Sequence, residues 1–314
     1  MKAQHLRRRL PTAEAALRIH PDVTMVGIGE TEAGAYAFVV GMEPRADPGR
    51  PLPPRLIVDD LSVPVLTRPC PADSLRTGDG SDGGNTALDG SDLLIAGVVG
   101  RTGTLGLVVA EAGGLGRLFG LTNAHVVTEP DRDATGDPIK AHVNGADRNI
   151  GTVAYQAPYN TGGGNTIDMA LIALNAEGRR LARQHRIQTF PGETVVGSGG
   201  LSFSRFAGAR RPHRYGGSTL DSRDVVPLAN PVEHAAIDLT DRSGARIRFG
   251  RAFTIDAGDG GVRGGHSGAL VVRTSTSGGM IAAGLLAGGR GAVAVAFSFR
   301  DVLAELDRSG IGLV

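Results

Sequence analysis

From Leu93 to the end, the chain is a succession of short apolar runs separated by glycine, and this pattern constrains the fold most. The runs include LLIAGVVG, GTLGLVV, MALIAL and AVAVAFSF. Short Val- and Leu-rich runs bounded by turn residues are typical of β-strands, and many of them in succession favour an antiparallel barrel or sandwich. The only helix that the pattern predicts in this part covers Phe299 to Leu306, where apolar residues recur on one helical face.

Composition narrows the choice further. The chain has 314 residues with 48 Gly and 17 Pro, which weaken helix interiors and argue against a helical bundle. Its one cysteine, Cys70, excludes an intrachain disulfide and a cysteine-based zinc site. The formal net charge is +1, so no strong field favours nucleic acid. No apolar run approaches the ~20 residues that span a bilayer, and the N-terminus lacks the apolar core of a signal peptide. We therefore expect a cytoplasmic protein with neither a nucleic-acid nor a membrane partner.

Three regions of the chain differ in composition and in the pattern of their apolar residues. Residues 1–70 combine a helical pattern from Ala13 to Ile19 with strand-like runs such as MVGIG and AFVVGME, which predicts a small α+β domain. Residues 71–92 contain a Gly- and Asp-rich stretch that cannot bury enough apolar surface to offset its ordering entropy, which predicts a linker. Residues 93–314 form the β-rich domain.

Three blocks of this domain contain residues that could do chemistry. His125 lies in LTNAHVV, Asp168 in NTIDMALIAL and Ser267 in RGGHSGALVV, each beside an apolar strand. Taken singly, each residue also has a purely structural interpretation. His125 could be a half-buried histidine, Asp168 could cap a turn, and Ser267 could lie in an ordinary glycine-rich turn. The glycines around Ser267 allow a sharp turn that points successive N–H groups into one small space, where they can stabilise an oxyanion.

The combination of the three blocks is more specific than any one of them. His, Asp and Ser in this chain order reproduce the order of one of the convergent catalytic triads. Asp168 follows His125 closely enough to share one strand-rich lobe, whereas Ser267 lies much further along the chain. Two lobes that meet at a cleft would bring the three side chains together.

The same blocks carry a family resemblance. LTNAHVV, DMALIAL and GGHSGALVV resemble the His, Asp and Ser blocks of trypsin-like (chymotrypsin-fold) serine peptidases. The chain is also similar to the bacterial relatives of plant Narrow-leaf-type proteases, through GTLGLVV before the histidine block, MVGIG and LPPRLIVDDLSVPV near the start, and AVAVAFSFRDVLAEL near the end. This resemblance implies a mostly β fold: a two-lobed antiparallel β-barrel with a small α+β N-terminal domain and a C-terminal helix.

The resemblance also implies an activity and its residues. In a serine endopeptidase of this kind, Ser267 is the nucleophile, His125 the general base, and Asp168 the group that fixes the histidine tautomer. The backbone N–H groups of Gly265 and Ser267 would form the oxyanion hole. A protein or peptide is the expected substrate, with no metal and no organic cofactor. His266 stands where the family has aspartate, and we expect its side chain to brace the turn.

The expected substrate pocket is walled by residues 256–264 and by the strand at 282–289. Gly261 leaves its floor uncharged, which favours small or apolar side chains, and we interpret Asp259 as an exposed turn carboxylate.

Two alternatives stay open. The chain could be a catalytically silent trypsin-like fold that binds partners through residues 1–70, because fold does not fix function. It could also be a peptidase that needs a homo-oligomer or an activating protein partner to order residues 256–266.

Overall fold

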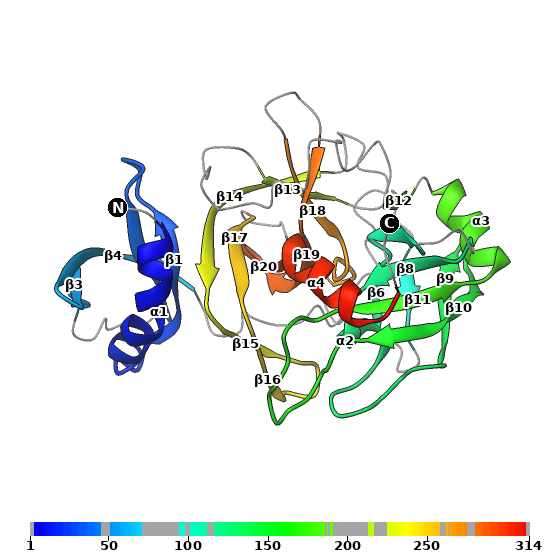
Figure 1. Ribbon diagram of the computed structural model, residues 1–314, viewed down its shortest axis with the longest axis horizontal. Coiled ribbons are helices and arrows are strands. Elements are labelled where there is room, and N and C mark those ends of the chain that lie inside the picture. The colour runs from blue at the N-terminus through cyan, green and yellow to red at the C-terminus, as the bar shows by residue number, and fades with distance from the viewer. Residues whose placement is uncertain are drawn as a thin grey trace.

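The chain is mostly β, with one helix near each end (Figure 1). These are α1 (Ala3–Leu17) and α4 (Phe299–Arg308), so the mostly β class and both terminal helices are confirmed. The computed structural model describes residues 3–44, 51–70, 94–97, 101–111, 116–185, 187, 189–190, 213–216, 225–257, 262, 264–274 and 280–311. The predicted linker at 71–92 lies outside the described residues, and the domain boundaries stay a prediction.

The larger sheet contains a closed ring. In spatial order its strands are β13 (His213–Gly216), β18 (Leu270–Thr274), β19 (Met280–Arg290), β20 (Val293–Ser298), β17 (Ala252–Asp256), β14 (Val225–His234), β1 (Val23–Glu30), β2 (Tyr36–Met42), β4 (Leu61–Pro69) and β3 (Arg55–Val58). Because β13 also pairs with β14, the first six strands close on themselves, and every pair in the ring is antiparallel. A closed ring leaves no free strand edge.

The second sheet is curled, and no pairing closes it among the described residues. Its order is β12 (Thr189–Phe190), β7 (Leu107–Ala110), β8 (Leu118–Thr122), β11 (Ala170–Leu174), β10 (Ala146–Gln156), β9 (Pro138–Val143), β5 (Leu94–Ala96) and β6 (Thr102–Thr104). A separate hairpin is formed by β15 (Ile237–Thr240) and β16 (Arg246–Phe249). Within the described strands, the pairs β2–β4 and β7–β12 are parallel, and the second of these departs from the antiparallel barrel expected for residues 93–314.

One hydrophobic cluster joins the two sheets. It contains Leu121 and Leu171 from the second sheet together with Leu285 and Phe297 from the ring. Burial of such side chains contributes about 1.5–3 kcal/mol each, so the cluster holds the facing sheets in a defined arrangement. The candidate site lies where these sheets meet.

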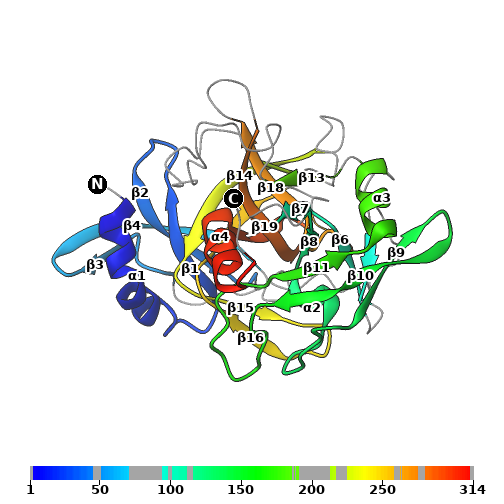
Figure 2. The same ribbon diagram turned by 45° about the vertical axis from the view of Figure 1, so that its right-hand side comes forward.

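The expectation of a single helix in residues 93–314 is wrong. A one-turn helix, α2 (Ala124–Val127), follows β8, and α3 (Ala176–Gln184) lies beside β10 (Figures 1 and 2). Asn175 caps α3 by accepting a hydrogen bond from the Gly178 N–H group. Only Leu181 and Ala182 bury apolar side chains from α3, so the apolar periodicity was too weak to predict it.

Helix α1 begins at Ala3, well before the predicted start at Ala13. Its buried side chains, Leu6, Leu10, Ala13 and Leu17, recur at helical spacing along one face. The basic residues and Pro11 between them concealed this repeat in the sequence. None of the described helices is long and apolar enough to cross a membrane.

The N-terminal strands continue the sheet of the ring, because β1 pairs with β14 at Ile28 and Glu233. The neighbouring His234 is fully buried, with Nδ1 2.8 Å from the Val26 carbonyl oxygen and Nε2 2.9 Å from the Thr254 hydroxyl. Desolvation by burial lowers the pKa of His234 to about 4. The imidazole is therefore neutral at pH 7, donating from Nδ1 and accepting at Nε2.

Candidate active site

Strand register brings His125 and Asp168 together. Strands β8 and β11 are antiparallel neighbours in which Thr122 pairs with Ala170. His125 lies in α2 just after β8, and Asp168 lies just before β11, so both side chains emerge at the same end of this pair. The sequence prediction that these two residues share one strand-rich lobe is thereby explained.

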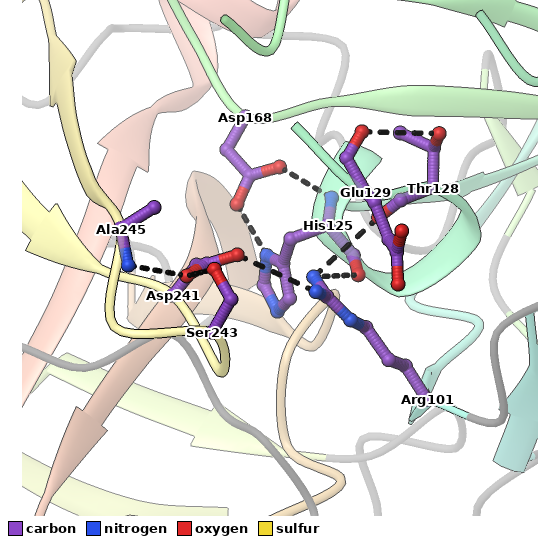
Figure 3. A network of polar contacts seen from close by, with 8 residues as sticks. All are labelled: Arg101, His125, Thr128, Glu129, Asp168, Asp241, Ser243 and Ala245. Carbon is purple, nitrogen blue, oxygen red and sulfur yellow. Dashed lines mark hydrogen bonds and ion pairs between the residues drawn. The ribbon is translucent and has the colours of Figure 1, made fainter. Parts of the chain in front are cut away.

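The two side chains form a buried pair (Figure 3). His125 Nδ1 lies 2.5 Å from Asp168 Oδ2, and the His125 backbone N–H donates to Asp168 Oδ1 at 3.1 Å. Asn123, the residue before α2, donates from its side chain to the Asp168 carbonyl oxygen at 2.7 Å. The carboxylate thus fixes the imidazole with the proton on Nδ1. The other ring nitrogen, Nε2, is buried and has no hydrogen-bond partner in the described part of the chain.

The loop that carries Ser267 is clamped by the second sheet. The Thr104 N–H donates to the Ser267 carbonyl oxygen, and the Thr104 hydroxyl donates to the Gly265 carbonyl oxygen, both at 2.7 Å. Gly265 and Gly268 have φ values of 92° and 91°, a left-handed conformation that favours glycine on either side of the serine. The predicted sharp turn at this position is therefore present.

Gly103 shows how closely the serine loop approaches the histidine segment. A Cβ atom on Gly103 would lie 2.4 Å from Val126 Cγ2 and 2.9 Å from the Ser267 carbonyl oxygen. Only a residue without a side chain fits between the residue after His125 and the serine loop. The structure therefore brings all three candidate residues to one seam between the sheets.

Ser267 does not, however, hydrogen-bond to His125 among the described contacts. Its hydroxyl donates instead to the Ala287 carbonyl oxygen at 3.2 Å. The backbone N–H groups of Ser267 and Gly265 donate to no backbone carbonyl of the described residues. The carbonyl of the buried His266 accepts from the Ala269 N–H at 3.0 Å and closes the turn.

Comparisons with known proteins show distant structural likenesses. No protein-family model matches the chain, and no curated protein sequence matches it. The chain is similar to a Nocardiopsis protease (NAPase), at 16% identity and a TM-score of 0.41, over 71% of this chain and 96% of that one. It is also similar to a human pathogenic astrovirus serine protease, at 15% identity and a TM-score of 0.32, over 67% and 89%. At scores this low, neither likeness assigns a function to this chain.

Sequence reasoning missed the charged residues that surround the pair. Arg101 and Asp241 lie beside His125, both buried, with Arg101 Nη2 3.4 Å from Asp241 Oδ2 (Figure 3). Thr104, which contacts the serine loop, was also missed, whereas Ala287 lies in the strand at 282–289 that was expected to wall the pocket. The spacing of the glycines in GTLG offered a signal for Thr104, because it indicates a strand packed closely against another backbone.

Tyr159 lies in the same charged environment. Burial raises the pKa of the Tyr159 phenol well above its ordinary value, and the negative charges of Asp168 and Asp241 raise it further. The phenol therefore stays protonated across the physiological range and does not compete with His125 as a base.

The predicted pocket walls are only partly described. Residues 282–288 are buried in β19, as a wall requires, whereas Gly261 and Asp259 lie outside the described residues. Among the residues that the structure describes, no group of three or more His, Cys, Asp or Glu side chains could hold a metal ion.

Proposed function

We propose that this chain is a serine endopeptidase with a two-lobed, chymotrypsin-like fold, and that Ser267, His125 and Asp168 cleave peptide bonds. The proposal rests on one observation above all. A buried imidazole is held by a carboxylate through Nδ1, while its Nε2 has no partner among the described residues, at the seam where a glycine-framed serine lies. A hydroxyl nucleophile needs a base of this kind.

The first chemical step forms the acyl-enzyme. The Ser267 hydroxyl rotates away from Ala287, and Oγ forms a bond to the substrate carbonyl carbon while its proton passes to His125 Nε2. The carbonyl π electrons move to oxygen, and the N–H groups of Gly265 and Ser267 stabilise the resulting oxyanion. When the carbonyl re-forms, the C–N bond breaks and the leaving amine takes the proton from Nε2.

The second step regenerates the enzyme. A water molecule gives a proton to Nε2 while its oxygen bonds to the acyl carbon. When this intermediate collapses, the bond between Ser267 Oγ and the acyl carbon breaks, Oγ takes the proton back from Nε2, and the carboxylic acid product leaves. Asp168 stays ionised throughout and stabilises the imidazolium. Each step is balanced without a metal or an organic cofactor, and the substrate is a protein or peptide.

Labelling with a fluorophosphonate probe tests the proposal. Wild-type protein should form a covalent adduct, Ser267→Ala should not, and the matched control Ser309→Ala at the end of α4 should label as wild type does. A folded wild-type protein that never labels, alone or with partners, contradicts the endopeptidase.

One observation favours the alternatives. The Ser267 hydroxyl contacts Ala287 rather than His125, and both Ser267 and His125 are only 1% exposed. A catalytically silent binding module would never label. A peptidase that needs an activating protein partner or a homo-oligomer would label only after the partner is added or above a threshold protein concentration.

A further inference from the structure

A buried cation lies against the backbone of α2. Arg101 is 5% exposed, and its Nη1 atom donates to the carbonyl oxygens of His125 at 3.2 Å and Thr128 at 3.4 Å (Figure 3). A one-turn helix cannot satisfy its C-terminal carbonyls within itself. The guanidinium therefore supplies donors that α2 lacks, and one of them reaches the peptide of His125 itself.

The charge of Arg101 is balanced by a carboxylate from a distant hairpin. Asp241 lies in the turn between β15 and β16, and its side chain is fully buried. Its Oδ1 accepts from the Ser243 hydroxyl at 2.7 Å and the Ala245 N–H at 2.9 Å, while Oδ2 faces Arg101 (Figure 3). Both carboxylate oxygens are therefore held, and the turn presents one of them to the arginine.

The same hairpin also holds the segment that leads to Asp168. The Asn165 side chain donates to the Arg248 carbonyl oxygen at 2.9 Å, and the Gly250 N–H donates to the Asn165 carbonyl oxygen at 2.9 Å. Residues 237–250 thus contact Arg101, which donates to the His125 carbonyl oxygen, and Asn165, which lies three positions before Asp168.

We propose that Arg101 and Asp241 are positioning residues for His125: they fix the α2 backbone so that the imidazole meets Asp168 through Nδ1 and keeps Nε2 available as a base. The assignment rests on the proposed function, and it extends it to residues outside the triad. Arginine is needed because its planar fork reaches the carbonyls of α2 and the carboxylate together, whereas lysine offers a single point charge.

The test compares Arg101→Lys with Arg7→Lys, a matched control. Arg7 pairs with Glu233 at 2.7 Å, and α1 lies near one end of the molecule, away from α2 (Figures 1 and 2). Three quantities are measured on each full-length protein: the melting temperature, the rate of fluorophosphonate labelling, and the downfield proton resonance of the His125–Asp168 hydrogen bond. We expect Arg101→Lys to slow labelling by about tenfold to a hundredfold and to shift or broaden that resonance, since small misplacements of a catalytic group cost this much. Arg7→Lys should change neither.

A second variant guards against unfolding. Replacing a buried ion pair by apolar residues often preserves folding, so the double variant Arg101→Met/Asp241→Leu should stay folded but label slowly. Labelling at the wild-type rate by either Arg101→Lys or the double variant, with an unshifted resonance, overturns the assignment. If wild type never labels but Arg101→Lys shifts the resonance, the endopeptidase fails and the positioning role stands.

Discussion

The Asp168→Asn substitution tests the candidate site at the level of single hydrogen bonds. In the structure Oδ2 accepts from His125 Nδ1 and Oδ1 accepts from the His125 backbone N–H. Asparagine has only one oxygen, so one of these two donors must face an NH₂ group instead.

The two possible orientations differ in cost. If the amide NH₂ faces the backbone N–H, a donor is left unsatisfied in a fully buried site, at about 1–3 kcal/mol. If the amide NH₂ group faces the ring, the imidazole keeps its orientation but changes tautomer. Nδ1 then becomes the acceptor and Nε2 carries the proton. The second orientation gives both the backbone N–H group and the amide NH₂ group an acceptor, and it therefore predominates.

A protonated Nε2 cannot accept the serine proton, so acylation slows. The same substitution in a serine protease triad lowers the rate by about 10⁴, which corresponds to about 5 kcal/mol of transition-state stabilisation at ~1.4 kcal/mol per tenfold. The assay is the second-order rate of fluorophosphonate labelling, with thermal melting to check folding.

Asp137→Asn is the control for this substitution, because Asp137 pairs with Arg132 at 2.6 Å on a partly exposed surface. It should label as wild type does. A folded Asp168→Asn protein that labels within about threefold of wild type refutes the tautomer argument, because the mechanism allows no such rate with a protonated Nε2.

Two further predictions concern stability and packing. Because the folded pKa of His234 is about 4, against 6.5 for a free histidine, the unfolded chain binds the extra proton between these values. The neutral His234 therefore stabilises the folded state fully above pH 6.5, and this stabilisation falls by up to about 3 kcal/mol as the pH drops to 4. Urea melts at several pH values should show this fall in the free energy of unfolding. His234→Gln should make the free energy of unfolding depend less on pH. Gly103→Ala places a methyl group 2.9 Å from the Ser267 carbonyl oxygen and 2.4 Å from Val126, so it should destabilise the fold by about 1–3 kcal/mol and slow labelling. Gly162→Ala, where a methyl group meets nothing within 4 Å, should leave both unchanged, and equal effects of the two would contradict the argument.

The parts of the fold that the sequence predicts are those with local causes. The strand-like runs MVGIG and AFVVGME near the N-terminus appear in β1 and β2, because short apolar runs between turns suffice to form strands. The helix at Phe299 was predicted from its apolar face, and Ser298 caps it by accepting from the Asp301 N–H. Helix α3 has almost no such face, and its stability depends on contacts with β10 that no local pattern encodes.

The residues of the candidate site also divide into those that have a local sequence signal and those that do not. His125, Asp168 and Ser267 were found because each stands in a local pattern that its chemistry requires. Arg101 and Asp241 were not, because their significance lies in a pairing across 140 positions that only the folded topology creates. The sequence does not distinguish a buried arginine from a surface arginine, because nothing adjacent to it reveals its burial.

The orientation of the Ser267 hydroxyl follows neither from a local sequence pattern nor from the folded topology. A serine hydroxyl can donate to a carbonyl oxygen or to an imidazole nitrogen, and rotation about a single bond exchanges one for the other. Donation to Ala287 leaves His125 Nε2 without a partner among the described residues, a buried polar atom whose desolvation costs about 1–3 kcal/mol. A hydroxyl that turned away from Ala287 would leave the Ala287 carbonyl oxygen with one fewer donor. In the endopeptidase that we propose, a substrate or partner that supplies another donor to the Ala287 carbonyl oxygen would therefore favour release of the Ser267 hydroxyl.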